Sequence, residues 1–355
     1  MMKIKIGNND VGEGHPVYFI AEIGSNHDGD MNRAIKLIQL AAESGANAAK
    51  FQNFRAPLIV SDYGFKKIAG TKSHQSNWKK TVFETYNDAS VPFEWANELC
   101  EVCNEHGLDY FSAPYDLEAV NMLERYFPAV KIGSGDITWL EIIELIASKN
   151  KPVLMSTGAS TIGDVQRAVE TVLRINKALI LMQCNTNYTG SVENFKHINL
   201  NVLKTYSTLY PDVVLGLSDH TPGHSTALGA IALGAKVIEK HFTDDKRRKG
   251  PDHAYAMDPE DFREMVDRSR ELESALGSTQ KFIADNEKET AIVQRRCLCA
   301  ARKITKGEVI TRELIEVLRP AIPGSIPPYE IGNVLGLKTV TDIQYGEAIT
   351  YKMLV

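Results

Sequence analysis

The chain has 355 residues, more than the roughly 100 to 200 that one domain usually holds, so more than one structural unit is expected. Hydrophobic residues make up 43% and charged residues 24% of the sequence, which is typical of a globular protein and excludes a disordered chain. The formal net charge of -5 excludes a broad basic surface for nucleic acid, so small-molecule chemistry is favoured.

A membrane-spanning protein and a disulfide-rich secreted protein are also disfavoured. The apolar stretches fall short of the roughly 20 residues that cross a bilayer, and the N-terminus, MMKIKIGNND, lacks a signal-peptide core. We therefore expect a cytoplasmic protein with no membrane partner. Five scattered cysteines do not form a disulfide framework, and Cys100 and Cys103 share one helical face, where they are expected to pack in the core.

The first 242 residues contain a hairpin signal followed by a repeated plan. KIKIG and the turn after it predict a small hairpin that closes the floor of the following unit. A short apolar run, a polar or Gly cluster and an amphipathic stretch then recur. The predicted strands are 17–23, 46–51, 108–112, 129–133, 152–156, 178–184, 213–218 and 235–242.

Eight strands separated by helical patterns indicate parallel pairing through βα crossovers, with helices over the sheet. About 230 residues suit a closed (β/α)8 TIM barrel, which usually takes roughly 250. An open doubly wound sheet is the alternative α/β fold, but it would favour G-x-G-x-x-G after the first strand. The turn here reads GSNHDGD, which does not match.

Two segments of the barrel have their own signals. The polar, aromatic-containing stretch 63–91 is longer than the other connections and is predicted to be a loop extended over the barrel mouth. Asp258, Pro259 and Gly277 provide an N-cap, a first helical residue and a C-terminal stop for a last barrel helix.

After residue 277 the alternation of apolar runs and helical patterns ends, and short turn-containing segments follow. We predict a barrel catalytic domain with its N-terminal hairpin over 1–277, a linker over 278–294 and a small, mostly β domain over 295–355. The small domain repeats a turn pattern, KITKGEVIT and DIQYGEAIT. Its core is too small to be very stable alone, so docking onto a barrel is expected.

Active sites of TIM barrels lie where the strands end, and nearly every predicted strand ends in a polar residue. Charges buried together without a ligand would cost several kcal/mol each, which favours a binding site. These residues are Glu22, Lys50 with Gln52, Ser112, Lys131 with Ser134, Ser156, Asn185 with Tyr188, Ser218 with His220, and Glu239 with His241.

Histidines and lysines among them suggest the chemistry. His220 and His241 end consecutive strands, about 5 Å apart in a parallel sheet, so both imidazoles can hold one divalent ion. Mn, Zn, Fe and Co all suit such a site. Lys50 and Lys131 lie in apolar runs and must face an anion or act as Schiff-base amines. A small substrate with phosphate and carboxylate groups is predicted, with a carbonyl partner at the metal.

Several motifs resemble those of a known family. AEIGSNHDGD, AAKFQ, KIGSGD, MSTGAS, GLSDHT, EKHFTDD and GPDH occur in this order. They are similar to signature segments of the N-acetylneuraminate (sialic acid) synthases, which are phosphoenolpyruvate-dependent nonulosonic acid synthases. Residues 295–355 resemble the antifreeze-like, or SAF, domain of that family.

The resemblance implies condensation of phosphoenolpyruvate with an N-acylated mannosamine-type aldose. The products are a nine-carbon 2-keto acid and phosphate, released by C–O cleavage. It also implies a divalent metal on His220 and His241, with Mn favoured over Mg or Co. A domain-swapped homodimer is implied, in which Arg319 of one copy reaches the sugar bound to the other.

The resemblance further assigns the site residues. Glu22, Lys50, Lys131, His220 and His241 are the implied catalytic residues, with Glu22 as the acid or base. The implied substrate-binding residues are Gln52, Ser112, Ser134, Ser156, Asn185, Tyr188, Ser218, Asp252 and Arg319.

Other functions stay open. Ser112 to Tyr115 and the CNTNYTG segment depart from the family pattern where the acyl groups of the sugar would be recognised, so the sequence predicts the reaction type rather than the sugar. A legionaminic or pseudaminic acid synthase, with the same chemistry, is the first alternative. A metal-independent Schiff-base aldolase using Lys50 or Lys131 is a second alternative. A non-catalytic carbohydrate-binding protein on an inherited barrel is a third.

Overall fold

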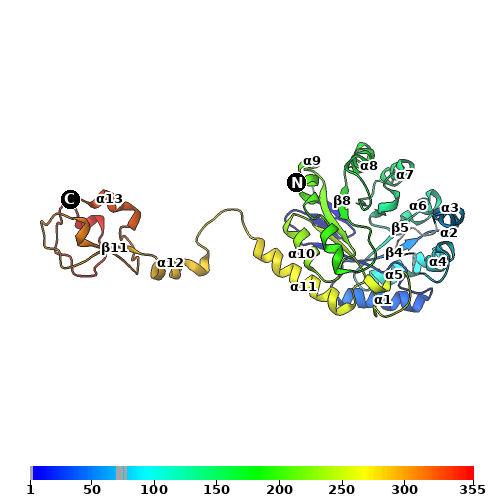
Figure 1. Cartoon of the computed structure of the whole chain (residues 1–355), viewed down its shortest axis with the longest axis horizontal. Helices are drawn as coiled ribbons and strands as arrows, with labels where there is room; N and C mark the ends of the chain where they lie inside the picture. The colour runs from blue at the N-terminus through cyan, green and yellow to red at the C-terminus, as the bar shows by residue number, and fades with distance from the viewer. Residues whose placement is uncertain (1–2, 69–74, 76–77) are drawn as a thin grey trace. The chain divides into compact units, whose positions relative to one another are not determined.

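The computed structural model describes residues 3–68, 75 and 78–355, and the chain divides into two compact units, Met1–Gly277 and Ser278–Val355 (Figure 1). The larger unit contains eight parallel strands, each falling in one of the predicted apolar runs. They are β3 Tyr18–Glu22, β4 Ala48–Asn53, β5 Asp109–Pro114, β6 Val130–Ile132, β7 Val153–Ser156, β8 Leu179–Cys184, β9 Val214–Asp219 and β10 Val237–His241.

The strands pair in the order β5-β4-β3-β10-β9-β8-β7-β6. The first and last strands of this order, β5 and β6, have residues within 8 Å of each other, so the sheet curves round on itself. The predicted TIM barrel is confirmed, and the open doubly wound sheet is not the fold of this chain.

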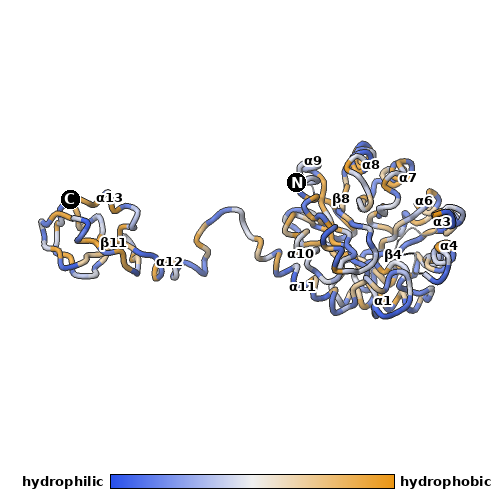
Figure 2. Tube along the Cα trace, in the orientation of Figure 1, coloured by the Kyte–Doolittle hydropathy of each residue, from blue (hydrophilic) through white to orange (hydrophobic). Residues whose placement is uncertain are grey.

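Helices follow the strands and cover the outside of the barrel (Figure 1). In chain order they are α1 Met31–Glu43, α5 Ala96–Glu105, α6 Leu117–Leu123, α7 Leu140–Ser148, α8 Ile162–Ile175, α9 Val202–Leu209, α10 Ser225–Ala232 and α11 Pro259–Leu276. They carry both hydrophobic and hydrophilic residues, as helices with one face on a sheet should (Figure 2). The last helix starts as predicted, because Asp258 accepts a hydrogen bond from the Asp261 amide and caps it.

Alternation along the strands separates an outer core from an inner one. Phe19 and Ala21 pack with the helices, whereas Tyr18 and Ile20 point into the barrel. The antiparallel hairpin β1 Lys3–Ile6 and β2 Asn9–Gly12 adds Ile6 and other apolar side chains to the inner core. Apolar packing thus fills the barrel near the strand starts and leaves the strand ends for polar residues.

The stretch 63–91 differs in part from the predicted loop, although residues 69–74, 76 and 77 lie outside the described residues. Two short helices lie in this region, α3 Asp62–Lys67 and α4 Val82–Ala89, and a third, α2 Ala56–Ile59, precedes it. Thr81 and Glu84 form a capping box at the start of α4, since each side chain accepts a hydrogen bond from the other's backbone amide. This T-x-x-E signal was present in the sequence, and the turn-like composition around it obscured it.

The smaller unit has an antiparallel pair, β11 Cys297–Ala300 and β12 Ile315–Leu318, and further isolated bridges. Leu298, Ile304 and Ile343 belong to its own apolar core. Its helices are α12 Lys288–Gln294, which lies in the predicted linker, and α13 Ile331–Val334. All five cysteines are free, as expected from their number and spacing. Among the described residues, no helix is both long and apolar enough to cross a membrane.

Candidate active site

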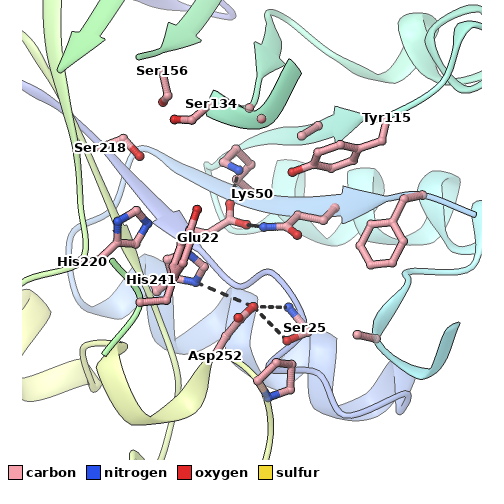
Figure 3. A pocket seen from close by; sticks show the side chains of 18 of the residues that line it. Glu22, Ser25, Lys50, Tyr115, Ser134, Ser156, Ser218, His220, His241 and Asp252 are labelled. Carbon is pink, nitrogen blue, oxygen red and sulfur yellow. Dashed lines mark hydrogen bonds and ion pairs between the residues drawn. The ribbon is translucent and has the colours of Figure 1, made fainter. Parts of the chain in front are cut away.

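A cavity of about 380 Å³ opens where the barrel strands end (Figure 3). Its size is in the range of small-molecule sites. Most residues predicted from the strand ends line it. They are Glu22, Lys50, Gln52, Lys131, Ser134, Ser156, Tyr188, Ser218, His220, Glu239 and His241. Asp252, which the family resemblance implied, lines the cavity as well.

Two carboxylates and two ammonium groups form a buried quartet at the base of this cavity. Lys50 is ion-paired with Glu22, its neighbour in register on the adjacent strand. The Lys131 ammonium lies 3.0 Å from a Glu239 carboxylate oxygen, and the Lys50 ammonium lies 3.7 Å from the same oxygen. None of the four side chains is more than 7% exposed, so their mutual pairing is needed to offset their loss of hydration.

The two carboxyl groups of the quartet differ in acidity. Burial, together with the nearby Glu239 charge, raises the pKa of Glu22 to about 7, despite the opposing charge of Lys50. Burial also disfavours ionisation of Glu239, but Lys131 and Lys50 outweigh it and hold the pKa of Glu239 at about 2. Glu22 can therefore gain or lose a proton near neutral pH while Glu239 stays charged, a separation typical of acid–base sites.

Gln52 fixes the orientation of the Glu22 carboxyl group. The Gln52 amide donates a 2.7 Å hydrogen bond to Glu22 Oε1. Gln52 lies two residues after Lys50 on β4, so both side chains face the cavity. This bond aims the Glu22 carboxyl group at the ligand space.

Three serines lie at the ends of separate strands or turns beside the quartet (Figure 3). Ser134 Oγ accepts a 2.9 Å hydrogen bond from the Gly158 amide, and Ser218 Oγ donates to Glu239 at 3.3 Å. A Cβ atom on Gly158 would come within 2.9 Å of Ser134 Oγ, so glycine is required for this approach. Ser156 Oγ is buried without a hydrogen-bond partner among the described residues, so it is available to form a hydrogen bond with a bound ligand.

The two histidines face each other across 5.3 Å between ring centroids. His220 Nδ1 lies 2.8 Å from the Asn185 carbonyl oxygen, which fixes the ring. Burial lowers the pKa of His220, and burial lowers the pKa of His241 to about 3, so both imidazoles are neutral near pH 7. Neutral imidazole is the form that binds metals.

These histidines fit a divalent metal ion. His241 Nδ1 is buried and accepts or donates no hydrogen bond within the described part of the chain. No group of three or more His, Cys, Asp or Glu side chains among the described residues is arranged as a complete metal site. The protein therefore offers two imidazole ligands, and water or substrate would complete the coordination of an ion there.

An aromatic and acidic wall continues from the histidines. The Tyr188 ring lies 4.4 Å from the His220 ring, and the Tyr255 ring lies 4.8 Å from the His241 ring, between centroids. Asp252 accepts hydrogen bonds from the Ser25 hydroxyl and the Tyr255 hydroxyl. Although burial opposes ionisation, the facing His241 and these hydrogen bonds lower the pKa of Asp252. Asp252 is thus a fixed hydrogen-bond acceptor.

A second buried ion pair lies behind the histidines. Lys240 Nζ is 2.7 Å from Asp219 Oδ2, and both side chains are at most 1% exposed. Asp219 precedes His220, and Lys240 precedes His241, on adjacent strands. Because successive side chains alternate between faces, the pair lies on the opposite face of the sheet and joins the two histidine-bearing strand ends.

Three residues predicted to bind substrate do not lie among the residues that line the cavity. Ser112 is buried, and its hydroxyl donates to Asn53 Oδ1 at 2.6 Å. Ser112 is in register with Phe51, which packs against the helices. The Ser112 side chain therefore points toward the helices and away from the cavity. Asn185 contributes its backbone carbonyl to His220, while its side chain donates to the His197 carbonyl. Arg319 belongs to the smaller unit, where it is exposed.

The strand-end analysis missed several lining residues, because they come from turns, loops and the short helix α4. Asp136, Phe54, Tyr86 and Tyr255 all line the cavity. Asp136 ends the KIGSGD motif, so its position in that motif was the available signal. The loop aromatics had no periodicity that could place them.

Family models match both units of the chain. The NeuB family model matches residues 37–281, and the SAF domain model matches residues 295–355. These matches cover most of each unit.

Several known proteins are similar to this chain over most of their length. The N,N'-diacetyllegionaminic acid synthase of Legionella pneumophila is 33% identical over 94% of each chain. The human N-acetylneuraminate-9-phosphate synthase is 31% identical, over 97% of this chain and 94% of its own. A crystal structure of a spore coat polysaccharide biosynthesis protein from Bacillus subtilis matches with a TM-score of 0.66 and 31% identity over 99% of each chain.

Proposed function

The chain belongs to the NeuB family, and from that premise we propose that it condenses phosphoenolpyruvate with an N-acylated mannosamine-type aldose. The products are a nine-carbon 2-keto acid and phosphate. One observation carries the proposal: the buried quartet of Glu22, Lys50, Lys131 and Glu239 lies between three serines and a histidine pair at one barrel mouth. The site therefore has anion-binding groups next to a neutral imidazole pair.

The two lysines and three serines bind phosphoenolpyruvate in this proposal. A ligand carrying both phosphate and carboxylate needs several cationic or hydroxyl donors, and Lys50 and Lys131 supply two ammonium groups. Ser134, Ser156 and Ser218 supply hydroxyl groups beside them, and Ser156 Oγ has no protein partner among the described residues. These three hydroxyl groups also position the enol phosphate for attack.

The reaction forms one C–C bond and breaks one C–O bond. C3 of phosphoenolpyruvate attacks the aldehyde carbon of the open-chain aldose, and Glu22 donates the proton that the aldehyde oxygen requires. Water then adds at C2, and the C2–O bond breaks to release phosphate and leave the 2-keto acid. Glu22 suits this role because its pKa of about 7 keeps a proton available near neutral pH.

His220 and His241 would hold a divalent ion, for which we propose Mn, with Mg or Co as alternatives. Such an ion supplies Lewis-acid polarisation of a carbonyl oxygen when it is bound. Tyr188 and Asp252 border the same space and would hold sugar hydroxyl groups in place. Asp252 is suited to accept hydrogen bonds because its pKa is lowered.

The charge state of Lys50 argues against the Schiff-base alternative for that residue. Burial disfavours its ammonium form, but Glu22 and Glu239 outweigh burial and raise the pKa of Lys50. A Schiff base requires a neutral amine, so Lys50 is a poor nucleophile in this environment. Borohydride treatment with pyruvate should accordingly leave no covalent adduct on Lys50.

We further propose a homodimer in which the smaller unit of one copy covers the barrel mouth of the other and brings Arg319 to its sugar. Supporting this, Phe282, Val293 and Tyr329 of that unit are 60%, 58% and 85% exposed, more apolar surface than so small a unit should leave in water. Arginine can hold hydroxyl or acyl oxygens with fixed geometry.

A complementation experiment tests the shared site. His241→Ala and Arg319→Ala proteins should each be nearly inactive alone. Mixed dimers formed by co-expression should recover activity, because one of their two sites then carries neither substitution. If the mixture stays as inactive as the separate variants while dimers form, Arg319 does not act across the dimer.

The function itself is tested by phosphate release. The protein is mixed with phosphoenolpyruvate, Mn and a panel of N-acylated hexosamines, and the product mass is measured. Phosphate release with a product that joins both carbon chains is expected, and Lys131→Met should abolish it. Absence of phosphate release across the panel, with intact fold and bound metal, would overturn the proposal. A cytoplasmic location stays a prediction of the sequence.

A further inference from the structure

Asp252 is held between two connections of the barrel. It belongs to the β10 connection, residues 242–258, and its carboxyl group is bound from the β3 connection, residues 23–30. The Ser25 hydroxyl and the Ser25 amide both donate hydrogen bonds to Asp252 Oδ2, at 2.8 and 3.2 Å (Figure 3). The direction of the Asp252 carboxylate therefore depends on how the two connections are joined.

A histidine next to Asp252 joins the same two connections. His253 is fully buried, and its Nε2 atom lies 2.9 Å from Asp28 Oδ1 in the β3 connection. Its Nδ1 atom lies 2.8 Å from Thr243 Oγ1 in the β10 connection. A Cβ atom on Gly250 would come within 2.6 Å of the His253 ring, so glycine is required for this packing. Both ring nitrogens are thus bonded, one residue away from Asp252.

The charge of Asp28 decides the direction of these hydrogen bonds. Burial opposes ionisation of Asp28, but hydrogen bonds from His253 and Arg248, together with the nearby Arg33 charge, outweigh it and lower the pKa of Asp28. An ionised carboxylate only accepts hydrogen bonds, so His253 Nε2 carries the proton that is donated to Asp28. Nδ1 of the neutral ring then accepts from the Thr243 hydroxyl. The orientation of the His253 ring is therefore fixed.

Other bonds join the two connections without His253. The Asn26 side-chain amide donates to the Phe242 carbonyl at 2.9 Å, and Arg33 Nη1 donates to Asp244 Oδ2 at 2.9 Å. These bonds remain when the contact between Asp28 and His253 is removed. Loss of that contact should therefore shift Asp252 while the barrel stays folded.

Resting on the proposed contact between Asp252 and the sugar, we propose that Asp28 and His253 are positioning residues for the aldose. Their hydrogen bond joins the two connections beside Asp252 and fixes the direction in which its carboxylate accepts from a sugar hydroxyl group. Neither of them belongs to the described lining of the cavity, so both act through Asp252. The roles of the NHDGD and GPDH motifs are thereby joined in one contact.

Two amide substitutions at one position separate the two bonds of the ring. In His253→Asn the amide group reaches only the position of Nδ1, so it can bond Thr243 but not Asp28. In His253→Gln it reaches the position of Nε2 and can donate to Asp28. With the aldose that releases phosphate fastest, His253→Asn should raise the KM for the aldose at least about fivefold, the effect of one weakened hydrogen bond, and change the KM for phosphoenolpyruvate less than about twofold. His253→Gln should leave both KM values within about twofold of the unmodified protein.

Substitutions of Asp28 test the other partner. Its φ is 53°, a left-handed conformation that glycine adopts without strain, so Asp28→Gly removes the carboxylate without straining the chain. Asp28→Gly should match His253→Asn, whereas Asp28→Asn keeps an acceptor oxygen for Nε2–H and should resemble the unmodified protein. Asp30→Ala is the matched control, because it removes the cap of α1 in the same connection and no bond to the β10 connection. It should leave the KM for the aldose unchanged.

Hydrogen exchange followed by mass spectrometry measures the β10 connection without any substrate. In Asp28→Gly and His253→Asn, residues 249–257 should exchange at least about threefold faster than in the unmodified protein, with exchange in α11 unchanged. If His253→Asn does not fold, Asp28→Gly carries the test, since the Asp28 side chain is already 25% exposed.

Asp252→Ala distinguishes the failure of this inference from failure of the proposed function. A raised KM for the aldose in Asp252→Ala, with an unchanged KM in folded Asp28→Gly and His253→Asn, overturns the positioning role and keeps the synthase function. Equal increases in KM for the aldose and for phosphoenolpyruvate in those two variants also overturn it. An unchanged KM for the aldose in Asp252→Ala overturns the contact between Asp252 and the sugar. No phosphate release by the unmodified protein with any sugar overturns the synthase function itself.

Discussion

Replacing Glu22 by Gln should make the protein more stable at alkaline pH while abolishing turnover. The pKa of Glu22 is raised from 4.5 to about 7, so the folded state holds this proton to a higher pH than the unfolded state does. The contribution of Glu22 to stability is therefore fully present below about pH 4.5 and is lost as the pH rises through 7. A shift of this size corresponds to about 3 kcal/mol of unfolding free energy.

Glutamine resembles the protonated carboxyl group and does not titrate. The variant should therefore be close to the unmodified protein in stability at pH 5 and about 3 kcal/mol more stable at pH 8. Urea unfolding monitored by tryptophan fluorescence measures this difference in the barrel, because Trp78, Trp95 and Trp139 all belong to the larger unit.

A second variant sharpens the test. The Gln52 hydrogen bond favours the ionised form of Glu22, so Gln52→Met should move the loss of stability to higher pH. An equal stability difference between Glu22→Gln and the unmodified protein at pH 5 and pH 8 would refute the raised pKa. The assignment of Glu22 as the proton donor would lose its physical basis as well.

The other predictions concern the histidines, the ion pair behind them and the smaller unit. His220→Ala or His241→Ala should weaken Mn binding by at least about 100-fold in calorimetry, with the circular dichroism spectrum unchanged, and Mn affinity equal to that of the unmodified protein would exclude the pair as ligands. Because the pKa of His241 lies near 3, the acid limb of Mn binding should fall well below pH 6.5, and a midpoint at 6.5 would contradict this. Lys240→Met should lower the free energy of unfolding by about 3 to 5 kcal/mol by leaving the Asp219 charge buried and unpaired, and a loss below 1 kcal/mol would show that other contacts hold the strand ends. Arg319→Ala should raise the KM for the aldose far more than that for phosphoenolpyruvate, and equal effects on both would remove its proposed contact with the sugar.

The sequence alone was sufficient to predict the barrel fold, because local patterns of apolar and polar residues mark its strands. Each apolar run ends in a polar residue, and a charged residue such as Lys50 within such a run can be tolerated only where several strand ends meet. Residue parity along one strand also placed Gln52 beside Lys50 and His241 beside Glu239 on the cavity side. These are properties of neighbouring residues, so no knowledge of distant contacts was required.

Contacts between distant segments were decided only by the tertiary structure. Ser112 ends a predicted strand like the other serines, but its register with Phe51 turns it toward the helices, and register cannot be read from one strand. The unequal acidities of Glu22 and Glu239 arise because each faces a different balance of burial and lysine charge, contributed by strands far apart in the chain. Local sequence thus determined which residues reach the barrel mouth, whereas pairing across the barrel set their charge, orientation and neighbours, because electrostatic and packing energies depend on distance in space.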